Sequence, residues 1–573
     1  MFKRLISKRI TRKYTSNNID PDEILLDAEN LPDFDQTRLE GRIEKPISKF
    51  SLYTIIGFFL LIVTLYTTQV WKLQVVEGNE LRERSENNSL RHSIIFADRG
   101  VVYDRNNIPL IWNSPSDEPD DFNKRVYTAT SGFSHILGYG KYPQKDSFGF
   151  YFTEEFEPKA GLERAYNKKL SGRSGLKIIE TNAQMEVVGD NTITDAEVGA
   201  NVVTTIDSRL QNIFYEKIKS VAQEVGFTGG AGAFIDVTNG DVIALTSYPE
   251  YNSSILTEGV DEETINRQFD DSSNFFLNRT ARGVYTPGSI MKPFVALAAL
   301  NEGIITPEKK IVSTKRMIIP NPYNPDNPSV FTDWKAHGPV NAREALAYSS
   351  NVYFYQVGGG FPETGQKGVG ITNLEKYYRG FGFGETFKED LLQGPTGTIP
   401  NPKWKALNFD DDDWRLGDTY FTSIGQYGVQ VTPLQVVRAI AGIANEGVFP
   451  ELRITKDTKE KKFIPQIAIA QEIRPDVYKT VKAGMRDVAS FGTGRGLNIP
   501  EVEIAAKTGT AELGFSKENV NSWTTGFFPY QNPKYAFVIV MEQGNRNNLI
   551  GGVSVMRQIL DWMRVSTPEY FNT

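Results

Sequence analysis

The sequence contains no cysteine and only three histidines among its 573 residues. The absence of cysteine excludes disulfide bonds, thiolate metal ligands and a cysteine nucleophile, and it suits a cell-surface compartment where thiols are a liability. His337 is the only histidine in the C-terminal two-thirds of the chain. Without a cysteine or a second histidine near it, the sequence predicts no zinc site.

An excess of basic residues is lacking as well. The chain has 63 Lys and Arg against 70 Asp and Glu, a net charge of -7, which gives no reason to expect nucleic acid as a partner. The acidic run Asp410–Asp413 is interpreted as a solvated loop in preference to a cation site. The length predicts two or more domains with at least one large core.

One long apolar run lies near the N-terminus, from Phe50 to Val70, and carries no charge. At about 1.5 Å per residue, a helix of this length spans a hydrocarbon core of roughly 30 Å. No small-residue cleavage site follows, which favours a retained anchor over a removed signal peptide. The basic residues before the run outnumber the single Lys72 just after it; they are Lys3, Arg4, Lys8, Arg9, Arg12, Lys13, Lys45 and Lys49.

This charge bias predicts a single-pass protein of the cell membrane with its N-terminus in the cytoplasm. We expect a cytoplasmic tail at residues 1–49, a transmembrane anchor at 50–70, a pedestal domain at 71–195 and a catalytic domain at 196–573. The tail is expected to be mobile, because it is highly charged and has few aromatic residues. The two later domains are expected outside the membrane.

The pedestal sequence predicts short strands and turns. Arg99 to Asn107 indicates a strand that enters a tight turn, and Leu170 to Glu180 indicates a helix, a glycine-containing turn and a strand. These residues are interpreted as a platform with no catalytic role.

In the second domain, Asp207 is expected to cap a helix that starts near Ser208. Asn239-Gly240 between two apolar runs predicts a β-hairpin, and Ala536 to Met541 predicts a strand buried on both faces. Strands come first, a helical middle follows and strands return. This order favours an α+β fold, with an antiparallel sheet and helices segregated around it.

A nucleophile is predicted at Ser289. Thr286-Pro287-Gly288 forces a turn, and Ile290 to Leu300 favours a helix that tolerates Pro293 in its first turn. Lys292 then lies one turn beyond Ser289 on the same face, where its amine can reach the serine oxygen. A buried lysine near other cationic groups can lose its proton and act as a base. Such a tetrapeptide is common by chance, so alone it is weak evidence.

Two further motifs follow along the chain. In Ser349-Ser350-Asn351, a hydroxyl can relay a proton and an amide can hold a peptide carbonyl, although a capping role explains the same pair. Lys507-Thr508-Gly509-Thr510 follows the apolar Ile504 to Ala506, as a strand edge would. Its glycine lets a substrate backbone approach, while its lysine and hydroxyls can bind a carboxylate.

In this order, the three motifs resemble those of class B penicillin-binding proteins, the peptidoglycan D,D-transpeptidases. The likeness covers nearly the whole extracytoplasmic chain, and its pedestal segments are most similar to the elongation-type penicillin-binding protein 2. Other segments that carry it are Tyr285 to Phe294, Arg99-Gly100, Asp104-Arg105, Gly161-Leu162-Glu163, Thr204 to Gln211, Ile424-Gly425-Gln426 and Thr432 to Gln435. The resemblance implies a transpeptidase fold, an antiparallel sheet with helices on both sides, above an extended pedestal.

The resemblance also implies roles for individual residues. Ser289 would form an acyl-enzyme with the stem peptide, Lys292 would accept its proton, and Ser349 and Lys507 would pass a proton to the leaving group. Backbone N–H groups of Ser289 and Thr510 would form the oxyanion hole. The substrate-binding residues would be Asn351, Thr508, Gly509 and Thr510. No cofactor and no metal are implied, and β-lactams would acylate Ser289.

A role in elongation is implied together with partners in the membrane. These are a glycan polymerase of the SEDS family and other elongation-complex proteins, because the chain is too short to contain a polymerase domain. The sequence departs from the family at three points. The segment from Leu110 to His135 is short where elongation-type relatives carry an extra head subdomain, Tyr427 separates Gln426 from Gly428, and Ala506 replaces a common glycine.

Other functions remain open at this point. The enzyme could serve septation, or water could resolve the acyl-enzyme, as in a D,D-carboxypeptidase or a β-lactamase. A non-catalytic membrane sensor or scaffold could retain the same fold. A Ser-His-Asp triad that uses His337 is a further alternative, disfavoured because Ser289 already has a lysine one turn away.

Overall fold

The computed structural model describes residues 48–82, 90–116, 121–147, 151–153, 155–181, 187–269, 274–321, 324, 326–456, 468–514 and 516–572. The predicted tail lies almost entirely outside these residues. The chain divides into two units, Met1–Ser89 and Leu90–Thr573.

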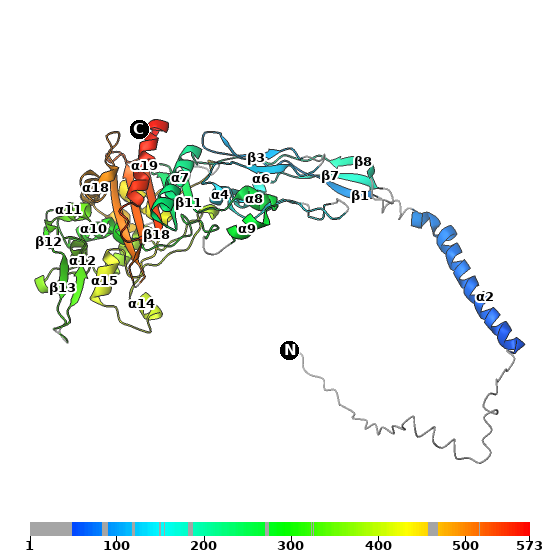
Figure 1. Cartoon of the computed structure of the whole chain (residues 1–573), viewed down its shortest axis with the longest axis horizontal. Coiled ribbons are helices and arrows are strands. Elements are labelled where there is room, and N and C mark those ends of the chain that lie inside the picture. The colour runs from blue at the N-terminus through cyan, green and yellow to red at the C-terminus, as the bar shows by residue number, and fades with distance from the viewer. Residues whose placement is uncertain are drawn as a thin grey trace, which may run out of the picture. The chain divides into compact units, whose positions relative to one another are not determined.

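The described part of the first unit is a long apolar helix. Helix α2 (Lys49–Trp71) continues into a π-helical turn, η2 (Lys72–Val76), and appears in blue in Figure 1. Residues Lys49–Val76 are long and apolar enough to cross a membrane, by length and composition. Hydroxyl groups inside the helix donate to its own carbonyls, such as Thr64 Oγ1 to Leu60 O at 2.7 Å. Such internal bonds satisfy polar groups where water is absent, so the described residues contain one candidate membrane span.

The second unit begins with small sheets that form the predicted pedestal. The sheet orders are β1-β7-β8, β4-β3-β2-β9 and β5-β6. The strands are β1 (Leu90–Ile95), β2 (Val102–Tyr103), β3 (Pro109–Ser114), β4 (Lys124–Tyr127), β5 (Gly140–Lys141), β6 (Glu157–Pro158), β7 (Gly175–Thr181), β8 (Val187–Thr194) and β9 (Val202–Val203). Between them lie α4 (Ser134–Leu137), α5 (Gly161–Ala165) and α6 (Asn167–Leu170). The strand and turn predicted at Arg99 to Asn107 are confirmed.

A buried ionic cluster joins two pedestal segments that carry the family resemblance. Glu163 Oε2 accepts from Arg99 at 2.5 Å, and Glu163 Oε1 accepts from Arg125 Nε at 2.7 Å. All three side chains are buried, and a buried carboxylate needs such partners. The cluster ties α5 to strand β4 and to the segment before β2.

A five-stranded antiparallel sheet organises the rest of the unit, in the order β11-β10-β18-β17-β16. Its strands are β10 (Gly229–Asp236), β11 (Val242–Tyr248), β16 (Ala505–Leu513), β17 (Asn519–Phe528) and β18 (Tyr535–Asn545). The hairpin predicted at Asn239-Gly240 joins β10 to β11, with Gly240 at φ +82°. Strand β16 forms one edge of the sheet and carries the predicted Lys507 motif.

Helices cover both faces of this sheet, as the resemblance implied (Figure 1). One face packs on α7 (Ser208–Val225) and α19 (Gly552–Ser566) through Phe537, Ile539 and Met541. The alternate residues Ala536, Val538 and Val540 belong to the core on the other face. The prediction of a strand buried on both faces is therefore confirmed. Asp207 caps α7 as expected, accepting from Arg209 N.

The helical middle of the chain lies mainly on that second face. Its helices are α10 (Lys292–Asn301), α11 (Ala342–Tyr348), α12 (Asn351–Gly359), α13 (Ile371–Gly380), α14 (Pro402–Asn408), α15 (Leu416–Ser423), α16 (Pro433–Ala444), α17 (Ala468–Glu472) and α18 (Pro475–Ser490). Helices α8 (Ser253–Glu258) and α9 (Glu262–Gln268) precede them, and short 3₁₀ turns occur at η3 (Gly288–Met291), η4 (Pro362–Thr364), η5 (Asp390–Leu392), η6 (Arg495–Leu497) and η7 (Pro568–Tyr570).

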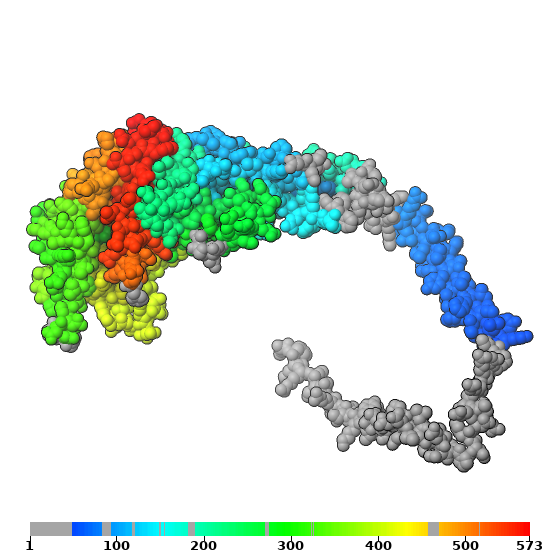
Figure 2. Space-filling model, viewed as in Figure 1, coloured from blue at the N-terminus to red at the C-terminus, as the bar shows by residue number. Residues whose placement is uncertain are grey.

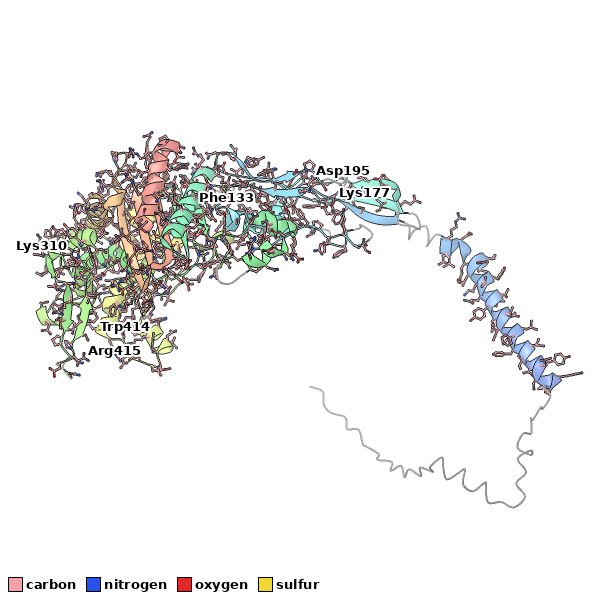
Figure 3. The ribbon with its side chains drawn as sticks, viewed as in Figure 1. Phe133, Lys177, Asp195, Lys310, Trp414 and Arg415 are labelled. Carbon is pink, nitrogen blue, oxygen red and sulfur yellow. The ribbon has the colours of Figure 1, made fainter. Side chains whose placement is uncertain are left out.

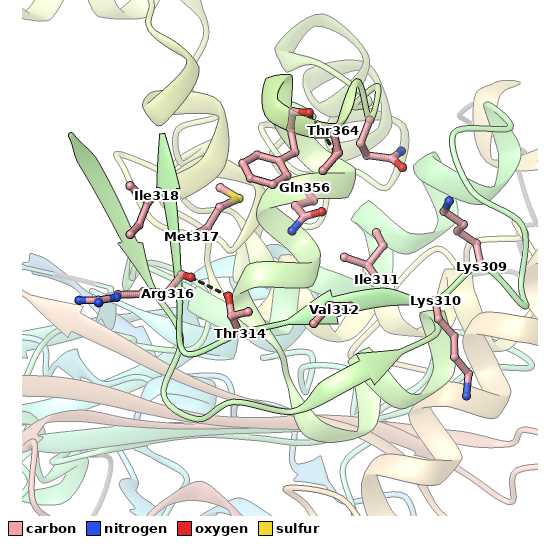
Figure 4. Close-up of a pocket in the computed structure, with 12 residues that line it drawn as sticks. Lys309, Lys310, Ile311, Val312, Thr314, Arg316, Met317, Ile318, Gln356 and Thr364 are labelled. Carbon is pink, nitrogen blue, oxygen red and sulfur yellow. Dashed lines mark hydrogen bonds between the residues drawn. The ribbon is translucent and has the colours of Figure 1, made fainter. Parts of the chain in front are cut away.

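Two short hairpin-like pairs accompany these helices. Strand β12 (Ile311–Ser313) pairs with β15 (Gly338–Val340), and β13 (Arg316–Ile319) pairs with β14 (Ser329–Thr332). A pocket of about 530 Å³ lies between β12, β13 and Gln356 of α12 (Figure 4). None of the eight predicted site residues lines it.

In Figure 2, the β13–β14 pair and the segment around α14 form two projections at the lower left of the second unit.

One of the contacts between the pedestal and the domain that follows it is made by the loop at Gly132–Ser134. Glu250 accepts hydrogen bonds from Gly132 N at 2.6 Å and from Ser134 N at 2.9 Å. Gln211 of α7 donates to the Gly132 carbonyl, and Phe133, labelled in Figure 3, is buried beside that helix. A polar pocket of about 400 Å³ lies at this junction.

Candidate active site

Strand β16 supplies one wall of the site. Lys507 and Gly509 are buried, whereas Thr508 is half-buried and Thr510 is exposed. This alternation follows from the two-residue period of a strand. The Nζ atom of Lys507 donates to Ser349 Oγ at 2.9 Å and to Thr508 O at 2.9 Å. The predicted strand edge thus directs a lysine toward the second motif.

Ser289 lies in the 3₁₀ turn η3, and the α-helix starts only at Lys292. The predicted helix start at Ile290 is therefore wrong by two residues. The physical reason is that Gly288, at φ +58°, opens a tighter turn. In a 3₁₀ turn, residues i and i+3 eclipse each other, so Ser289 and Lys292 still share one face. Ser289 Oγ has no hydrogen-bond partner within the described part of the chain, and the residue is half-buried.

The amine of Lys292 is fully buried and bonded to the second motif. Its Nζ atom donates to Ser349 O and to Asn351 Oδ1, both at 2.7 Å, and lies 3.3 Å from Ser349 Oγ. Burial lowers the pKa of Lys292 to about 7, against the opposing effect of the Asp333 charge. A lysine with this pKa is partly neutral at physiological pH, as a general base requires.

Ser349 lies between two helices in a left-handed conformation. It is the C-cap of α11 at φ +56°, and Ser350 then caps α12 by accepting from Tyr353 N. A non-glycine residue at positive φ is uncommon and is typical of functional sites. The conformation brings Ser349 Oγ within reach of both Lys292 and Lys507.

Lys507 is the second buried amine of the site. Its pKa is lowered well below the usual value, mainly by burial and further by the charge of Lys292. Two ammonium groups on one hydroxyl would repel each other, which disfavours double protonation. The three motifs predicted from the sequence therefore form one hydrogen-bonded cluster with one shared hydroxyl at its centre.

Thr508 contacts a residue that lies outside the three motifs. Thr508 Oγ1 is 2.6 Å from the hydroxyl of Thr493, in the loop after α18. The sequence analysis did not single out Thr493, because it belongs to no motif and is brought near only by the packing of α18. These two hydroxyls form a donor pair suited to a carboxylate.

Gly509 fits the site for a reason that differs from the predicted one. A Cβ atom there would lie 2.9 Å from Pro287 O and 3.0 Å from Ile290 Cγ2. The absent side chain thus leaves room for the turn that carries Ser289. The predicted close approach of the substrate backbone stays a prediction.

Asp333 is a buried carboxylate behind Ser349-Ser350-Asn351 that the sequence analysis missed. Its Oδ2 atom accepts from Val352 N at 2.9 Å, Ser350 Oγ at 3.0 Å and Ser313 Oγ at 3.3 Å. No motif or periodicity marks this aspartate, because its partners are distributed over β12 and α12.

His337 lies next to Asp333, but the described residues form no triad with it. Its Nε2 atom is 3.8 Å from Asp333 Oδ1, and its ring stacks on Tyr348 at 5.7 Å between centroids. Burial lowers the pKa of this imidazole, so it is neutral at pH 7. Across the described part of the chain, no group of three or more His, Cys, Asp or Glu residues could hold a metal.

Within the acidic run Asp410–Asp413, Asp412 pairs with cations of the protein itself. Asp412 bonds Lys405 at 3.0 Å and Arg415 at 2.7 Å. Trp414 and Arg415 are labelled on this segment in Figure 3. The inserted Tyr427, at φ +56°, packs its ring among Trp404, Phe409 and Trp414. The insertion thus builds an aromatic cluster on this loop.

The other departures from the family are accommodated locally. Ala506 pairs across the sheet with Gly526, and a Cβ at Gly526 would lie 2.9 Å from Ala506 Cα. The glycine therefore makes room on the neighbouring strand. In the pedestal, β3 pairs directly with β4 within the short segment from Leu110 to His135.

Comparison with known families agrees with this arrangement. Residues 230–561 match the model of the penicillin binding protein transpeptidase domain. Residues 118–204 match the penicillin-binding protein dimerisation domain.

Individual relatives are similar over most of their length. Peptidoglycan D,D-transpeptidase MrdA of Haemophilus influenzae is 29% identical over 499 residues, 80% of this chain and 72% of that protein. The Escherichia coli K12 protein of the same name is 25% identical over 89% of this chain and 93% of its own. The solved complex between PBP2 and MreC from Helicobacter pylori matches with a TM-score of 0.67 and 25% identity, covering 83% of this chain and 99% of that one. The predicted fold and resemblance are confirmed.

Proposed function

Because this chain belongs to the penicillin-binding protein transpeptidase family, we propose that it is a serine-type peptidoglycan D,D-transpeptidase. The single observation that carries the proposal is the cluster in which Lys292, one turn after Ser289, and Lys507 both bond Ser349 Oγ. The proposed catalytic residues are Ser289, Lys292, Ser349 and Lys507. Relatives named D,D-transpeptidase support the same activity.

In the first step, Ser289 Oγ attacks the carbonyl carbon of the penultimate D-alanine of a stem peptide. Its proton passes to Lys292, whose pKa of about 7 makes the amine available as a base. The bond between the two D-alanines then breaks, and the leaving amine takes a proton through Ser349, which bonds both lysines. The product is an ester on Ser289 and free D-alanine.

The substrate is held by groups on both walls of the site. Thr508, Thr510 and Lys507 bind the terminal carboxylate, and the Asn351 amide orients the peptide backbone. Backbone N–H groups of Ser289 and Thr510 stabilise the oxyanion, an effect of about 3 kcal/mol per donor in comparable sites. Gly509 lets the substrate backbone lie along β16 as an added strand.

In the second step, the side-chain amine of a neighbouring stem peptide displaces Ser289 and forms the cross-link. A hydrolase would use water at this point, so the two activities differ in their products. The purified full-length protein, given stem peptide and an acceptor amine, is expected to yield cross-linked dimer. Trimmed peptide alone would show a carboxypeptidase. Retention of both activities in Ser289→Ala would refute the assignment of the nucleophile.

The cellular role is elongation at the cell membrane, with residues 1–49 in the cytoplasm and the catalytic part outside. The MrdA relatives and the solved complex of an H. pylori relative with MreC support this role and an elongation-complex partner. A separate polymerase of the SEDS family would supply glycan strands. Depletion is expected to give rounded cells, whereas filaments would indicate a septal enzyme. Protease added outside intact cells should remove the catalytic part and spare an N-terminal tag.

A further inference from the structure

The buried carboxylate of Asp333 lies at the point where the second motif is held. Its Oδ2 atom receives three donors, from Val352 N, Ser350 Oγ and Ser313 Oγ, while Oδ1 receives Trp334 N at 2.9 Å. The side chain is fully buried. Four donors of this kind stabilise the negative charge of a buried carboxylate.

That charge acts on the base. Lys292 bonds Ser349 and Asn351, and Asp333 bonds the residues on either side of Asn351, which are Ser350 and Val352. The two charged groups therefore hold the same four-residue turn from opposite sides. The Asp333 charge acts on Lys292 in the direction that favours the ammonium.

Other charges near this turn do not replace Asp333. Burial lowers the pKa of the His337 imidazole and of the Lys507 amine, and the hydroxyl of Tyr355 bonds Thr332 O at 3.3 Å. Lys335 is exposed to solvent, and Glu512 lies further along β16, where it pairs with Lys517 and Arg546. Within the described residues, Asp333 is the acidic side chain whose charge acts on Lys292.

We propose that Asp333 is a positioning residue for acylation: its carboxylate fixes the Ser349-Ser350-Asn351 turn and stabilises the ammonium that Lys292 becomes on taking the Ser289 proton. The inference rests on the proposed function. The step is balanced, because the O–H bond of Ser289 breaks, the Oγ–C bond forms and the proton is held on Nζ. The charge favours the protonated base in the free enzyme and in the transition state alike.

Loss of the Asp333 charge should therefore change both the pKa of Lys292 and its strength as a base, whereas structural damage alone would not change the pKa in this way. In Asp333→Asn, Lys292 loses its proton at lower pH but becomes a weaker base. In a plot of acylation rate against pH, the rise on the acidic side (the acidic limb) should move to lower pH by about one unit. The constant rate reached at alkaline pH (the plateau) should fall by about tenfold. A purely structural role would lower the plateau and leave the limb in place.

The experiment measures acylation of the full-length protein in detergent by a fluorescent penicillin, from pH 5 to 9.5. Ser313→Ala is the matched control, because it removes a donor to the same Oδ2 atom and keeps the charge. Its limb should coincide with that of the wild type. If Asp333→Asn does not fold, Asp333→Ser keeps one small acceptor and should shift the limb in the same direction.

The outcomes separate this inference from the proposed function. Absence of acylation in the wild type would reject the proposed function itself. Acylation in the wild type, with a limb that does not move in either Asp333 variant, would overturn only the role of Asp333. A limb that moves equally in Ser313→Ala would also overturn it, because the carboxylate charge is intact there.

Discussion

The Nζ atom of Lys507 lies 2.9 Å from the Oγ atom of Ser349, and the Nζ atom of Lys292 lies 3.3 Å from the same oxygen. One hydroxyl therefore joins two buried amines that come from β16 and α10. Because a hydroxyl both donates and accepts, it can transfer a proton from one amine toward a leaving group near the other. This relationship supports the proposed role of Ser349 in proton transfer.

Removal of the Ser349 hydroxyl should lower the rate constant of acylation more than it weakens the initial binding of penicillin. In Ser349→Ala, we expect the acylation rate constant to fall by about 100-fold, since general acid–base groups contribute at least this much. Stopped-flow fluorescence with a penicillin reporter separates the rate constant from the initial binding constant. Ser490→Ala, at the end of α18 and bonded only to its own helix, is the control and should acylate normally. Equal slowing of both variants would contradict the relay.

The pH dependence of acylation should report Lys292. Its pKa is lowered to about 7 by burial, and the neutral amine is the active form. Acylation should therefore be slow well below pH 7, rise tenfold per unit near pH 6 and level off above about pH 8. A rate that stays constant between pH 5.5 and 8.5 would show that Lys292 is not the base.

The lowered pKa of Lys292 should also make the free energy of unfolding depend on pH. The folded pKa of about 7 lies below the usual 10.5, so the unfolded chain binds more protons than the folded one between these values. The folded wild type then gains stability as pH rises from 7 toward 10.5. Lys292→Met lacks this gain.

Thermal unfolding of the two proteins at pH 7 and pH 9.5 tests this relation. The difference in unfolding free energy, wild type minus variant, should become more favourable by about 3 kcal/mol between these values. A pH-independent difference would mean that the Lys292 amine is charged in the folded protein throughout.

Substitution of Gly509 should damage the turn that carries Ser289. The added Cβ of Gly509→Ala meets backbone Pro287 O at 2.9 Å and Ile290 Cγ2 at 3.0 Å, contacts that force η3 away from β16. We expect a loss of about 1–3 kcal/mol in stability and at least a tenfold slower acylation by penicillin. Gly189→Ala on β8 is the control, because its Cβ meets only Glu180 Oε2 at 3.9 Å. Normal acylation in Gly509→Ala would remove the proposed reason for this glycine.

The sequence was most informative where local rules decide the structure. Asn239-Gly240 specifies its hairpin, Asp207 caps α7, and the apolar run at Ala536 specifies a strand buried on both faces, because each depends on neighbours in the chain. The three catalytic motifs were found through their residue types and order. The start of the helix after Ser289 was misjudged by two residues, since Gly288 selects a 3₁₀ turn that helix propensity does not reveal.

What the sequence did not reveal depends on contacts between distant segments. Asp333 serves the site through Ser313, Ser350 and Val352, and Thr493 reaches Thr508 only because α18 ends beside β16. The left-handed conformation of Ser349 arises where α11 and α12 meet. A single aspartate or threonine in a loop carries no local signal of such contacts, so only the folded chain shows them.

The most direct test of the account is the mass of the intact full-length protein after exposure to penicillin, followed by mapping of the modified peptide. The account predicts one added penicilloyl group, on Ser289, that is absent in Ser289→Ala. An unmodified wild-type protein, or a group mapped to another residue, would contradict the central claim that Ser289 is the nucleophile.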